Sequence, residues 1–471
     1  MLNLDEALTY TSGTKYYQKR LTFLFGLGQI AIAFLVMGIP LMFPEFDEIC
    51  DKSNNCQIPS KYADSASAEL SVYGENKSKI SYIGSSYFSG MMIFSLIISW
   101  LSDNKGRKTV VFFSAIICSC IIFLLAFSWN FNVVVFAYFI FGGAELGVYC
   151  SGFILLTESV EPSQRNIFSG AALCTWGIGS IILMLLFMSG LYWRVILSIS
   201  FFIMFSYIFL LRYILESPRW LFQSNLGLIE VKKVLSKISV LNGRGEFDLD
   251  LKMKNENNGK TYTYLIFLQN KELMKTVILC ILIWLNVVLV YYSMIFLMAS
   301  FIENVYVEGL VMAIGETVAT IFVSYFVNVI GRKKAAICCF LVSAAAFALI
   351  GVIPLIGKGW FSEVCVLVLS FFARAAISGE FNLFYIYIAE LFPTSVRNMA
   401  FGLCNNIGRI GGIISSNIPI ISRTLNINPS FLISIILLVS AFLSTFLEET
   451  LNKEMRDHII EKPSSRDSFD Y

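Results

Sequence analysis

The stretch LSDNKGRK, residues 101–108, lies between two long apolar segments, ISYIGSSYFSGMMIFSLIISW (80–100) and TVVFFSAIICSCIIFLLAFSW (109–129). Half of its residues are charged. A helical segment of about 20 apolar residues is long enough to cross the roughly 30 Å hydrocarbon core of a bilayer. The stretch is therefore predicted to be a short charged turn between two membrane-spanning helices.

The composition extends this interpretation to the whole chain. Its 471 residues are 56% hydrophobic and 14% charged, whereas about a quarter of the residues of a soluble domain are charged. Backbone groups within lipid must be satisfied inside the segment, which favours helices over open strands. We predict an all-α polytopic membrane protein with twelve transmembrane helices. The predicted spans are 21–43, 81–101, 109–128, 132–156, 166–188, 191–214, 273–298, 305–327, 335–356, 362–388, 398–421 and 430–447.

The distribution of charge orients these spans. Lysine and arginine concentrate in the short loops around 104–108 and 332–334 and in the segment 215–272, whereas acidic residues dominate 44–80. By the positive-inside rule, both termini and 215–272 are expected to be cytoplasmic. The predicted organisation is a cytoplasmic N-terminus (1–20), an N-terminal six-helix bundle (21–214) with an exterior loop (44–80), a cytoplasmic linker with short helices (215–272), a C-terminal six-helix bundle (273–447) and a cytoplasmic tail (448–471).

Two motifs occur twice in the chain. DNKGRK (103–108) matches NVIGRK (328–333), and ESVEPSQR (158–165) matches ELFPTSVR (390–397). The offsets are similar, 225 residues from 103 to 328 and 232 residues from 158 to 390. Two repeats nearly in register indicate a duplicated six-helix unit, as in the major facilitator fold. The alternative is that each GRK stretch is only a tight basic loop.

The residue types in the repeated turns suit contacts that form and break. Glycine permits a turn too tight for a side chain, arginine offers a planar fork to a carboxylate, and an acidic residue is favoured at a helix start. We therefore expect these charges to make breakable contacts between the two bundles at the cytoplasmic face.

Together the motifs resemble those of the organic cation, anion and zwitterion transporters of the major facilitator superfamily. The resemblance rests on LSDNKGRK, the TES…R segment at 157–165, ESPRW (216–220), NVIGRK and AELFPTSVRN (389–398). It implies a gate network with charge relays that pair Glu158 with Arg165 and Glu390 with Arg397. The implied gating residues are Asp103, Gly106, Arg107, Glu158, Arg165, Glu216, Arg219, Gly331, Arg332, Glu390 and Arg397. Asn328 replaces the acid usual in the second turn, which predicts a weaker gate in the C-terminal half.

Five ionisable residues lie near the midpoints of predicted spans, namely Glu145, Glu316, Arg374, Glu380 and Arg409. Each unpaired central charge costs roughly 2.5–3.5 kcal/mol on insertion scales. These side chains must therefore face a water-filled cavity, pair across helices or titrate to the neutral form. Arg374 and Glu380 are six residues apart, about 240° around a helix, so they are not expected to pair with each other. The alternative is that the five charges only tie helices together.

The resemblance makes Arg409 and Glu316 the leading substrate-binding candidates. Arg409 matches a position that is arginine in anion- and zwitterion-transporting members, and Glu316 matches an acidic position. Trp284 and Tyr291 are seven residues apart and so share a helix face. They match aromatic positions that line the family's central cavity, although ordinary packing is the alternative for both. Asn382 and Tyr292 are further candidates.

These residue types favour a zwitterion or an anion as the substrate. A guanidinium binds a carboxylate through two parallel hydrogen bonds, and aromatic faces attract quaternary ammonium groups. We predict a secondary active or facilitative transporter that moves a small organic ion, carnitine- or betaine-like, by alternating access. An organic cation is the less favoured substrate class. A sugar porter and a non-transporting receptor or sensor are the alternative functions.

Other features exclude several classes of function. The only histidine is His458 in the tail, and no catalytic set, metal-ligand spacing or nucleotide-binding loop is evident. Neither an enzyme nor a metal site nor a cofactor is therefore expected. The coupling ion stays open between Na⁺, no ion, and H⁺ carried by Glu145, Glu316 or Glu380. The expected partners are the organic ion and the lipid bilayer, without nucleic acid or an obligate protein partner, and the resemblance implies the plasma membrane.

The exterior loop holds two candidate modification sites. Cys50 and Cys56 are candidates for a disulfide, because the exterior is oxidising. Asn76 begins an Asn-Lys-Ser glycosylation sequon.

Overall fold

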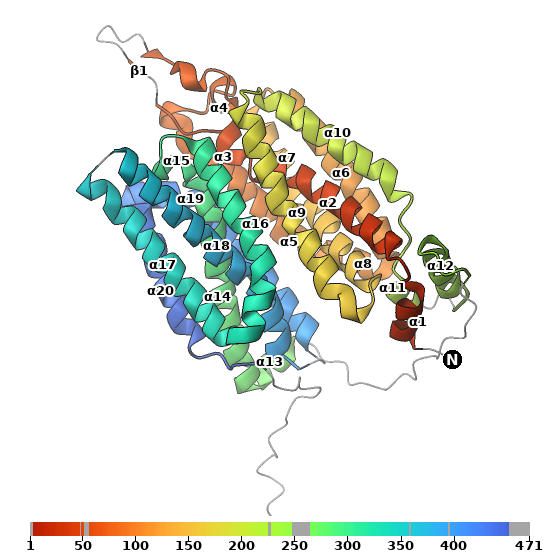
Figure 1. Cartoon of the computed structure of the whole chain (residues 1–471). Helices are drawn as coiled ribbons and strands as arrows, with labels where there is room; N and C mark the ends of the chain where they lie inside the picture. The colour runs from red at the N-terminus through yellow and green to blue at the C-terminus, as the bar shows by residue number, and fades with distance from the viewer. Residues whose placement is uncertain are drawn as a thin grey trace, which may run out of the picture.

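The computed structural model describes residues 3–47, 49–50, 56–224, 228–246, 264–357, 359–393 and 396–451. Figure 1 shows two groups of helices side by side, the first half of the chain (red to yellow-green) on the right and the second half (green to blue) on the left. We call the end that carries loop 44–80 the loop end, and the end that carries residues 103–108 and 328–333 the turn end.

The first half consists of α1 (Leu4–Thr11), α2 (Tyr16–Val36), α3 (Ile39–Met42), β1 (Ile49–Cys50), β2 (Cys56–Gln57), α4 (Ala66–Glu69), α5 (Ser81–Lys105), α6 (Arg107–Phe127), α7 (Phe131–Leu146), the π-helical turn η3 (Gly147–Ser151), α8 (Gly152–Glu158), α9 (Arg165–Met188) and α10 (Trp193–Leu211), with 3-10 turns at Ser60–Tyr62, Gly74–Ile80 and Pro162–Gln164. The connecting segment holds α11 (Pro218–Gln223), α12 (Leu228–Leu241) and α13 (Leu265–Gln269). The second half consists of α14 (Lys271–Phe296), α15 (Met298–Phe301), α16 (Val305–Ile330), α17 (Arg332–Ile356), α18 (Trp360–Leu391), α19 (Arg397–Leu425) and α20 (Pro429–Ser444).

Within the described residues, ten helices are long and apolar enough to cross a membrane. They overlap the first ten predicted spans. The last two predicted spans, 398–421 and 430–447, overlap α19 and α20, which qualify only as a pair and are bent by 118° at their junction. The prediction of an all-α membrane protein is confirmed, with two-residue strands in loop 44–80 as the exception.

Asparagine marks the start of several spans. The side chains of Asn130, Asn270, Asn304 and Asn428 each accept a hydrogen bond from a backbone N–H in the first turn of α7, α14, α16 and α20. Such a cap satisfies a backbone donor that the helix itself leaves free. The sequence thus fixes where these helices begin.

The two repeated turns have the same backbone conformation. Gly106 has φ 95° and ψ 150°, and Gly331 has φ 97° and ψ 156°, a region in which essentially only glycine is found. A Cβ atom at Gly106 would lie 2.4 Å from Oε2 of Glu216, and one at Gly331 would lie 2.6 Å from Oε2 of Glu449. Both glycines are needed for the φ value and for the close approach of a carboxylate.

Those two carboxylates close the turns in the same way. Glu216 accepts a hydrogen bond from the backbone N–H of Lys108 at 3.0 Å. Glu449 accepts from the backbone N–H groups of Arg332 at 2.9 Å and Lys333 at 3.1 Å. Although partial burial raises the pKa of Glu449, hydrogen bonds from Leu451, Arg332 and other backbone N–H groups hold that pKa below its ordinary value. Each half therefore supplies, from the end of its last span, the acid that caps its own turn.

Helix packing divides the chain into the two halves and then joins them. Within the first half α5 packs on α7, α2 on α9 and α6 on α10, and within the second half α14 packs on α19, α16 on α18, and α17 on α18 and α20. Two pairs join the halves, α5 with α19 and α9 with α16. A cavity that lies between the halves is therefore bordered by helices from both.

The segment before the first span is docked on the connecting segment. Ala7 and Leu8 of α1 pack against an apolar cluster that contains Trp220, Leu221, Val231 and Leu235 of α11 and α12. The buried side chain of Asn242 accepts a hydrogen bond from the backbone N–H of Tyr17 at 2.9 Å and donates to the carbonyl of Thr11 at 2.8 Å and to Gln18 at 3.0 Å. The side chain of Asn242 thus holds the first turn of α2 against the connecting segment.

We predict that Gly106→Ala lowers the free energy of unfolding by roughly 1–3 kcal/mol, because alanine is strained at this φ and ψ and displaces Glu216. Thermal unfolding of the purified protein measures the change. Gly170→Ala on α9 is the control, since a Cβ atom there meets nothing within 4 Å. Equal melting temperatures for Gly106→Ala and Gly170→Ala would contradict the prediction.

Candidate functional site

A cavity with about 660 Å³ of empty volume, counting the part open to solvent, lies between the two halves. It is bordered by α2, α5, α7, η3 and α9 from the first half and by α14, α16, α18 and α19 from the second. The lining residues are Gln29, Met91, Glu145, Tyr149, Ala172, Leu173, Trp176, Tyr291, Tyr292, Glu316, Thr320, Ser378, Phe381, Asn382, Tyr385 and Arg409.

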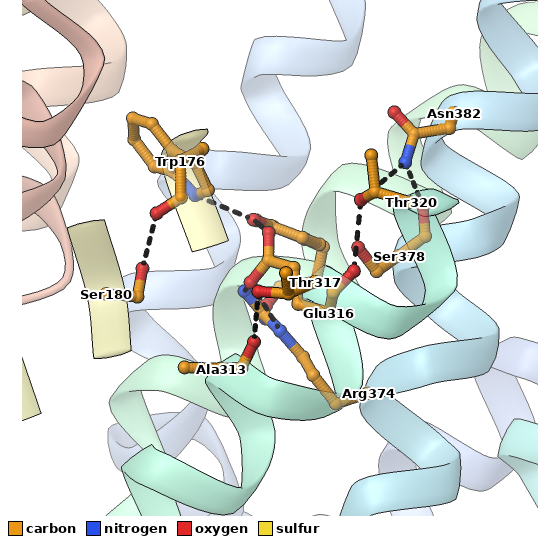
Figure 2. A network of polar contacts seen from close by, with 10 residues as sticks. Trp176, Ser180, Ala313, Glu316, Thr317, Thr320, Arg374, Ser378 and Asn382 are labelled. Atoms are coloured by element: carbon orange, nitrogen blue, oxygen red, sulfur yellow. Dashed lines mark hydrogen bonds and ion pairs between the residues drawn. The ribbon is translucent and has the colours of Figure 1, made fainter. Parts of the chain in front are cut away.

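A buried ion pair lies on the second-half side of this cavity (Figure 2). Arg374 donates to Oε2 of Glu316 from Nη2 at 2.7 Å and from Nε at 3.2 Å, and from Nη1 to the carbonyl of Tyr291 at 2.7 Å. The hydroxyl of Tyr291 donates to Oε1 of Glu316. The pair therefore links α14, α16 and α18 and uses both oxygens of Glu316.

The same network reaches across to the first half. Figure 2 shows Trp176 of α9 directed toward this network, and its Nε1 donates to the hydroxyl of Tyr291 at 3.1 Å. The guanidinium of Arg374 lies 3.8 Å from the centre of the Tyr291 ring. One face of that ring is thus occupied by a cation of the protein. Its hydroxyl is bonded to Glu316 and Trp176, so Tyr291 is mainly part of the network that supports the cavity.

Arg409 differs from Arg374 because it has no such partner. Among the described residues, its buried guanidinium makes no hydrogen bond or ion pair, although it lines the cavity. Glu145 lines the cavity from the opposite half, is also buried, and accepts a hydrogen bond from the hydroxyl of Tyr87. Arg409 and Glu145 act on each other electrostatically. In the described residues, the cavity is therefore lined by a cation of the second half without an ion-pair partner and by an acid of the first half.

The glycine-rich sequence of α19 brings Arg409 to this position. A Cβ atom at Gly408 would lie 2.2 Å from the ring of Trp284, one at Gly411 2.2 Å from the carbonyl of Leu285, and one at Gly412 2.3 Å from the ring of Phe88. The missing side chains let α19 lie close to α14 and α5. Trp284 packs on this helix and on Phe384, outside the cavity lining.

Two other substrate-binding candidates, Glu380 and Asn382, are also placed by the structure. Glu380 is fully buried outside the lining, and among the described residues its carboxylate oxygens accept no hydrogen bond. Asn382 lines the cavity and donates to the carbonyl of Ser378 at 3.1 Å and to Thr320 at 3.4 Å. Sequence reasoning missed the lining aromatics Tyr149, Trp176, Phe381 and Tyr385, since no local signal separates them from the other aromatic residues of a chain that holds 42 Phe, 21 Tyr and 7 Trp.

The gating residues of the first half form a cluster at the turn end. Arg107 pairs with Asp103 at 3.0 Å and with Glu158 at 3.3 Å, and the hydroxyl of Ser217 donates to Glu158. Arg165 pairs with Asp5 of α1 at 3.5 Å, and Arg219 also pairs with Asp5. The direct pairs are therefore Glu158 with Arg107 and Arg165 with Asp5, because α1 brings its own acid to this surface. Glu158 still acts on Arg165 electrostatically, and the relay between them stays a prediction.

The second half repeats this arrangement. Arg332 donates to both oxygens of Glu390, from Nε and from Nη2, each at 2.9 Å. Thr450 donates to the same carboxylate at 2.5 Å. Arg397, the expected relay partner of Glu390, is the first residue of α19, and the side chain of Asn328 lies outside the described part. Each of these turn-end contacts lies within one half, whereas contacts between the bundles were expected.

Polar contacts between the halves occur at the loop end instead. Arg423 of α19 pairs with Glu45. The hydroxyls of Ser85 and Ser416 are 3.0 Å apart, and Asn417 donates to Ser85 at 2.9 Å. The ammonium of Lys61 donates to the carbonyl of Glu303 at 3.4 Å. The halves are therefore held together on the loop-end side of the cavity.

The modification candidates lie in loop 44–80. Strands β1 and β2 pair antiparallel with Cys50 opposite Cys56, and the disulfide between them stays a prediction. Asn76 is exposed on a 3-10 turn before α5, and its glycosylation also stays a prediction. In the part of the chain that the structure describes, no group of three or more His, Cys, Asp or Glu side chains is placed to hold a metal ion.

Comparison with known proteins extends these observations. The sequence model of the Major Facilitator Superfamily matches residues 21–416. The chain is 29% identical to organic cation/carnitine transporter 4 of Arabidopsis thaliana over 453 residues, which cover 88% of this chain and 82% of that protein. It is 28% identical to a solute carrier family 22 member 15-like protein of Xenopus laevis (97% and 96% covered) and 25% identical to organic cation/carnitine transporter 2 of Homo sapiens (79% and 67% covered). The resemblance stated from the motifs is confirmed.

Solved structures agree with the fold. The inward-open xylose transporter XylE from E. coli matches with a TM-score of 0.64 at 16% identity, covering 94% of this chain and 97% of that one. A D-xylose–proton symporter matches with a TM-score of 0.65 at 13% identity, covering 92% and 99%. The predicted major facilitator fold is confirmed, and at these identities the likeness concerns the fold alone.

We predict that Arg374→Met lowers the free energy of unfolding by about 3–5 kcal/mol, because it leaves Glu316 buried without its cation. The double variant Glu316→Gln/Arg374→Met removes both charges and should regain part of the loss. Melting temperatures of the purified variants measure both effects, with the exposed Lys334→Gln as a control for the loss of a basic residue. An unchanged melting temperature for Arg374→Met would show that the pair is not structural.

Proposed function

Given that the chain belongs to the Major Facilitator Superfamily, we propose that it moves a small organic ion across a membrane, with Arg409 binding the carboxylate of that ion. The observation that carries this proposal is the guanidinium of Arg409, which lines the cavity between the halves and has no hydrogen bond or ion pair within the described part of the chain. A buried cation without a partner is unfavourable, and a carboxylate supplies two parallel hydrogen bonds to it. The cavity is thus complementary to an anionic group at Arg409.

Glu145 gives the cavity a second charge of opposite sign. Glu316 is held by Arg374 and Tyr291, which leaves Glu145 as the lining acid without a cation at ion-pair distance in the described part. The rings of Tyr149, Trp176, Phe381 and other lining aromatics add an apolar wall, which favours a quaternary ammonium group. A zwitterion with its carboxylate at Arg409 and its cationic nitrogen near Glu145 satisfies both charges.

The positions of the two charges connect binding to alternating access. Glu145 belongs to α7 of the first half and Arg409 to α19 of the second, so one bound ion contacts both halves. Moving to the opposite state requires the loop-end contacts to break, among them Arg423 with Glu45 and Ser85 with Ser416. We infer that the bound zwitterion replaces the attraction between Glu145 and Arg409 and so lets the halves move around a neutralised cavity.

Uptake into vesicles that contain the purified protein tests this function. Three labelled solutes are compared: a carnitine-like zwitterion, an aromatic carboxylate and tetraethylammonium. We predict zwitterion uptake by the natural chain, with the apparent affinity weakened about 10- to 100-fold in Arg409→Gln, because a charge-assisted bidentate contact is lost. Arg409→Lys keeps the positive charge but not the planar guanidinium, so its apparent affinity should lie between those of the natural chain and Arg409→Gln.

Two further variants separate the roles of the charges. Glu145→Gln should reduce uptake of the zwitterion more than uptake of the aromatic carboxylate, because only the zwitterion uses the acid. The matched control is Lys275→Gln, which replaces an exposed basic residue at the start of α14. It should change neither the uptake of the zwitterion nor that of the aromatic carboxylate. Tetraethylammonium uptake that persists in Arg409→Gln, without zwitterion uptake by the natural chain, would overturn the assignment. Transport of a hexose alone would favour a sugar porter.

A further inference from the structure

Two arginines meet on one aromatic ring at the turn end of the first half. Arg20 lies in the second turn of α2, and Arg212 follows the last residue of α10. Their guanidinium carbons are 4.9 Å and 5.1 Å from the centre of the Tyr213 ring. Arg20 also donates to the carbonyl of Tyr213 at 3.4 Å. This chain thus gathers two positive charges around a single half-exposed side chain.

Unlike four other arginines at the turn end, Arg20 and Arg212 have no acidic partner within the described residues. Arg107, Arg165, Arg219 and Arg332 each pair with a carboxylate, whereas in the described residues neither Arg20 nor Arg212 has an ion pair. Two like charges held near one ring repel each other, and the ring compensates only in part. The arrangement is therefore completed by an anion from outside the chain.

Apolar side chains continue from the two arginines along the outer surface. Phe23 lies three residues after Arg20 and is 64% exposed, and Phe209 lies three residues before Arg212 and is 51% exposed. Phe205 contacts Phe209 edge to face, with ring centres 5.0 Å apart, and is also exposed. Figure 1 shows α10 along the outer edge of the first half. A ligand at this place therefore meets cationic groups at one end and an apolar stripe along the span.

We propose that Arg20, Arg212 and Tyr213 form a binding site for the headgroup phosphate of an anionic phospholipid, whose acyl chains lie along Phe23, Phe205 and Phe209. Guanidinium groups bind phosphate through paired hydrogen bonds. The predicted orientation places the turn end at the cytoplasmic leaflet, where anionic lipids attract basic side chains. Because Arg20 belongs to α2 and Arg212 to α10, the lipid joins two spans that also contact through Ser200 and the carbonyl of Ala31 at 2.9 Å.

The experiment uses the full chain in nanodiscs of phosphatidylcholine, with or without phosphatidylglycerol. Native mass spectrometry counts retained phosphatidylglycerol, and thermal unfolding reports its stabilising effect. Arg20→Gln/Arg212→Gln is expected to weaken the affinity for phosphatidylglycerol roughly 10- to 30-fold. Each basic residue near the surface adds about 1 kcal/mol of attraction, and about 1.4 kcal/mol corresponds to a tenfold change in affinity. Lys271→Gln/Lys275→Gln, which removes two exposed basic residues at the start of α14, is the matched control and should retain the lipid.

Equal retention by the two double variants and the natural chain would overturn the proposal. So would an equal loss in both double variants, which would reflect general charge attraction without a site. Inorganic phosphate added to phosphatidylcholine nanodiscs should not raise the melting temperature; an equal rise with phosphate would exclude a lipid as the ligand. If the glutamine variant does not fold, Arg20→Lys/Arg212→Lys replaces it, and full retention by that variant would contradict the need for guanidinium groups.

Discussion

The ion pair between Arg374 and Glu316 holds α14, α16 and α18 together beside the cavity. It satisfies two of the five charges in the spans and fixes the hydroxyl of Tyr291, to which Trp176 of the other half donates. Burying a charge away from water is costly unless the charge is paired. Among the described residues that line the cavity, Arg409 is then the cation without an ion-pair partner. In the function we propose, the paired Arg374 belongs to the scaffold and Arg409 to the binding site.

Much of the fold follows from local sequence, and most of the site does not. Hydropathy located the spans, and the recurrence of DNKGRK and NVIGRK indicated the duplication, which Gly106 and Gly331 share down to their backbone angles. Glu449 was missed as the counterpart of Glu216, although both follow the last span of their half. The partners of Glu316 and Arg165 come from other helices, α18 and α1, so no spacing within one helix identifies them. Trp284 and Tyr291 share a helix face, but α19 packs against Trp284 at Gly408. Tyr291 lines the cavity and Trp284 does not.

The two ends of the molecule use their charges differently. At the turn end, Arg107 and Arg332 bind acids of their own half, which keeps each half rigid. At the loop end, Arg423 with Glu45 and the Ser85, Ser416 and Asn417 cluster join one half to the other. Contacts within a half persist when the halves move, whereas contacts between halves must be exchanged. The cavity lies between these two sets, and its charges, Glu145 and Arg409, are divided between the halves.

The origin of the groups that close each half has a consequence for synthesis on the ribosome. The turn at Gly106 is completed by Glu216, and the start of α2 is completed by Asn242. Both groups precede α14, so these two contacts of the first half can form before any span of the second half has been made. The turn at Gly331 instead awaits Glu449, beyond α20. Assembly therefore proceeds as two successive closures in the order of translation, the first independent of the second.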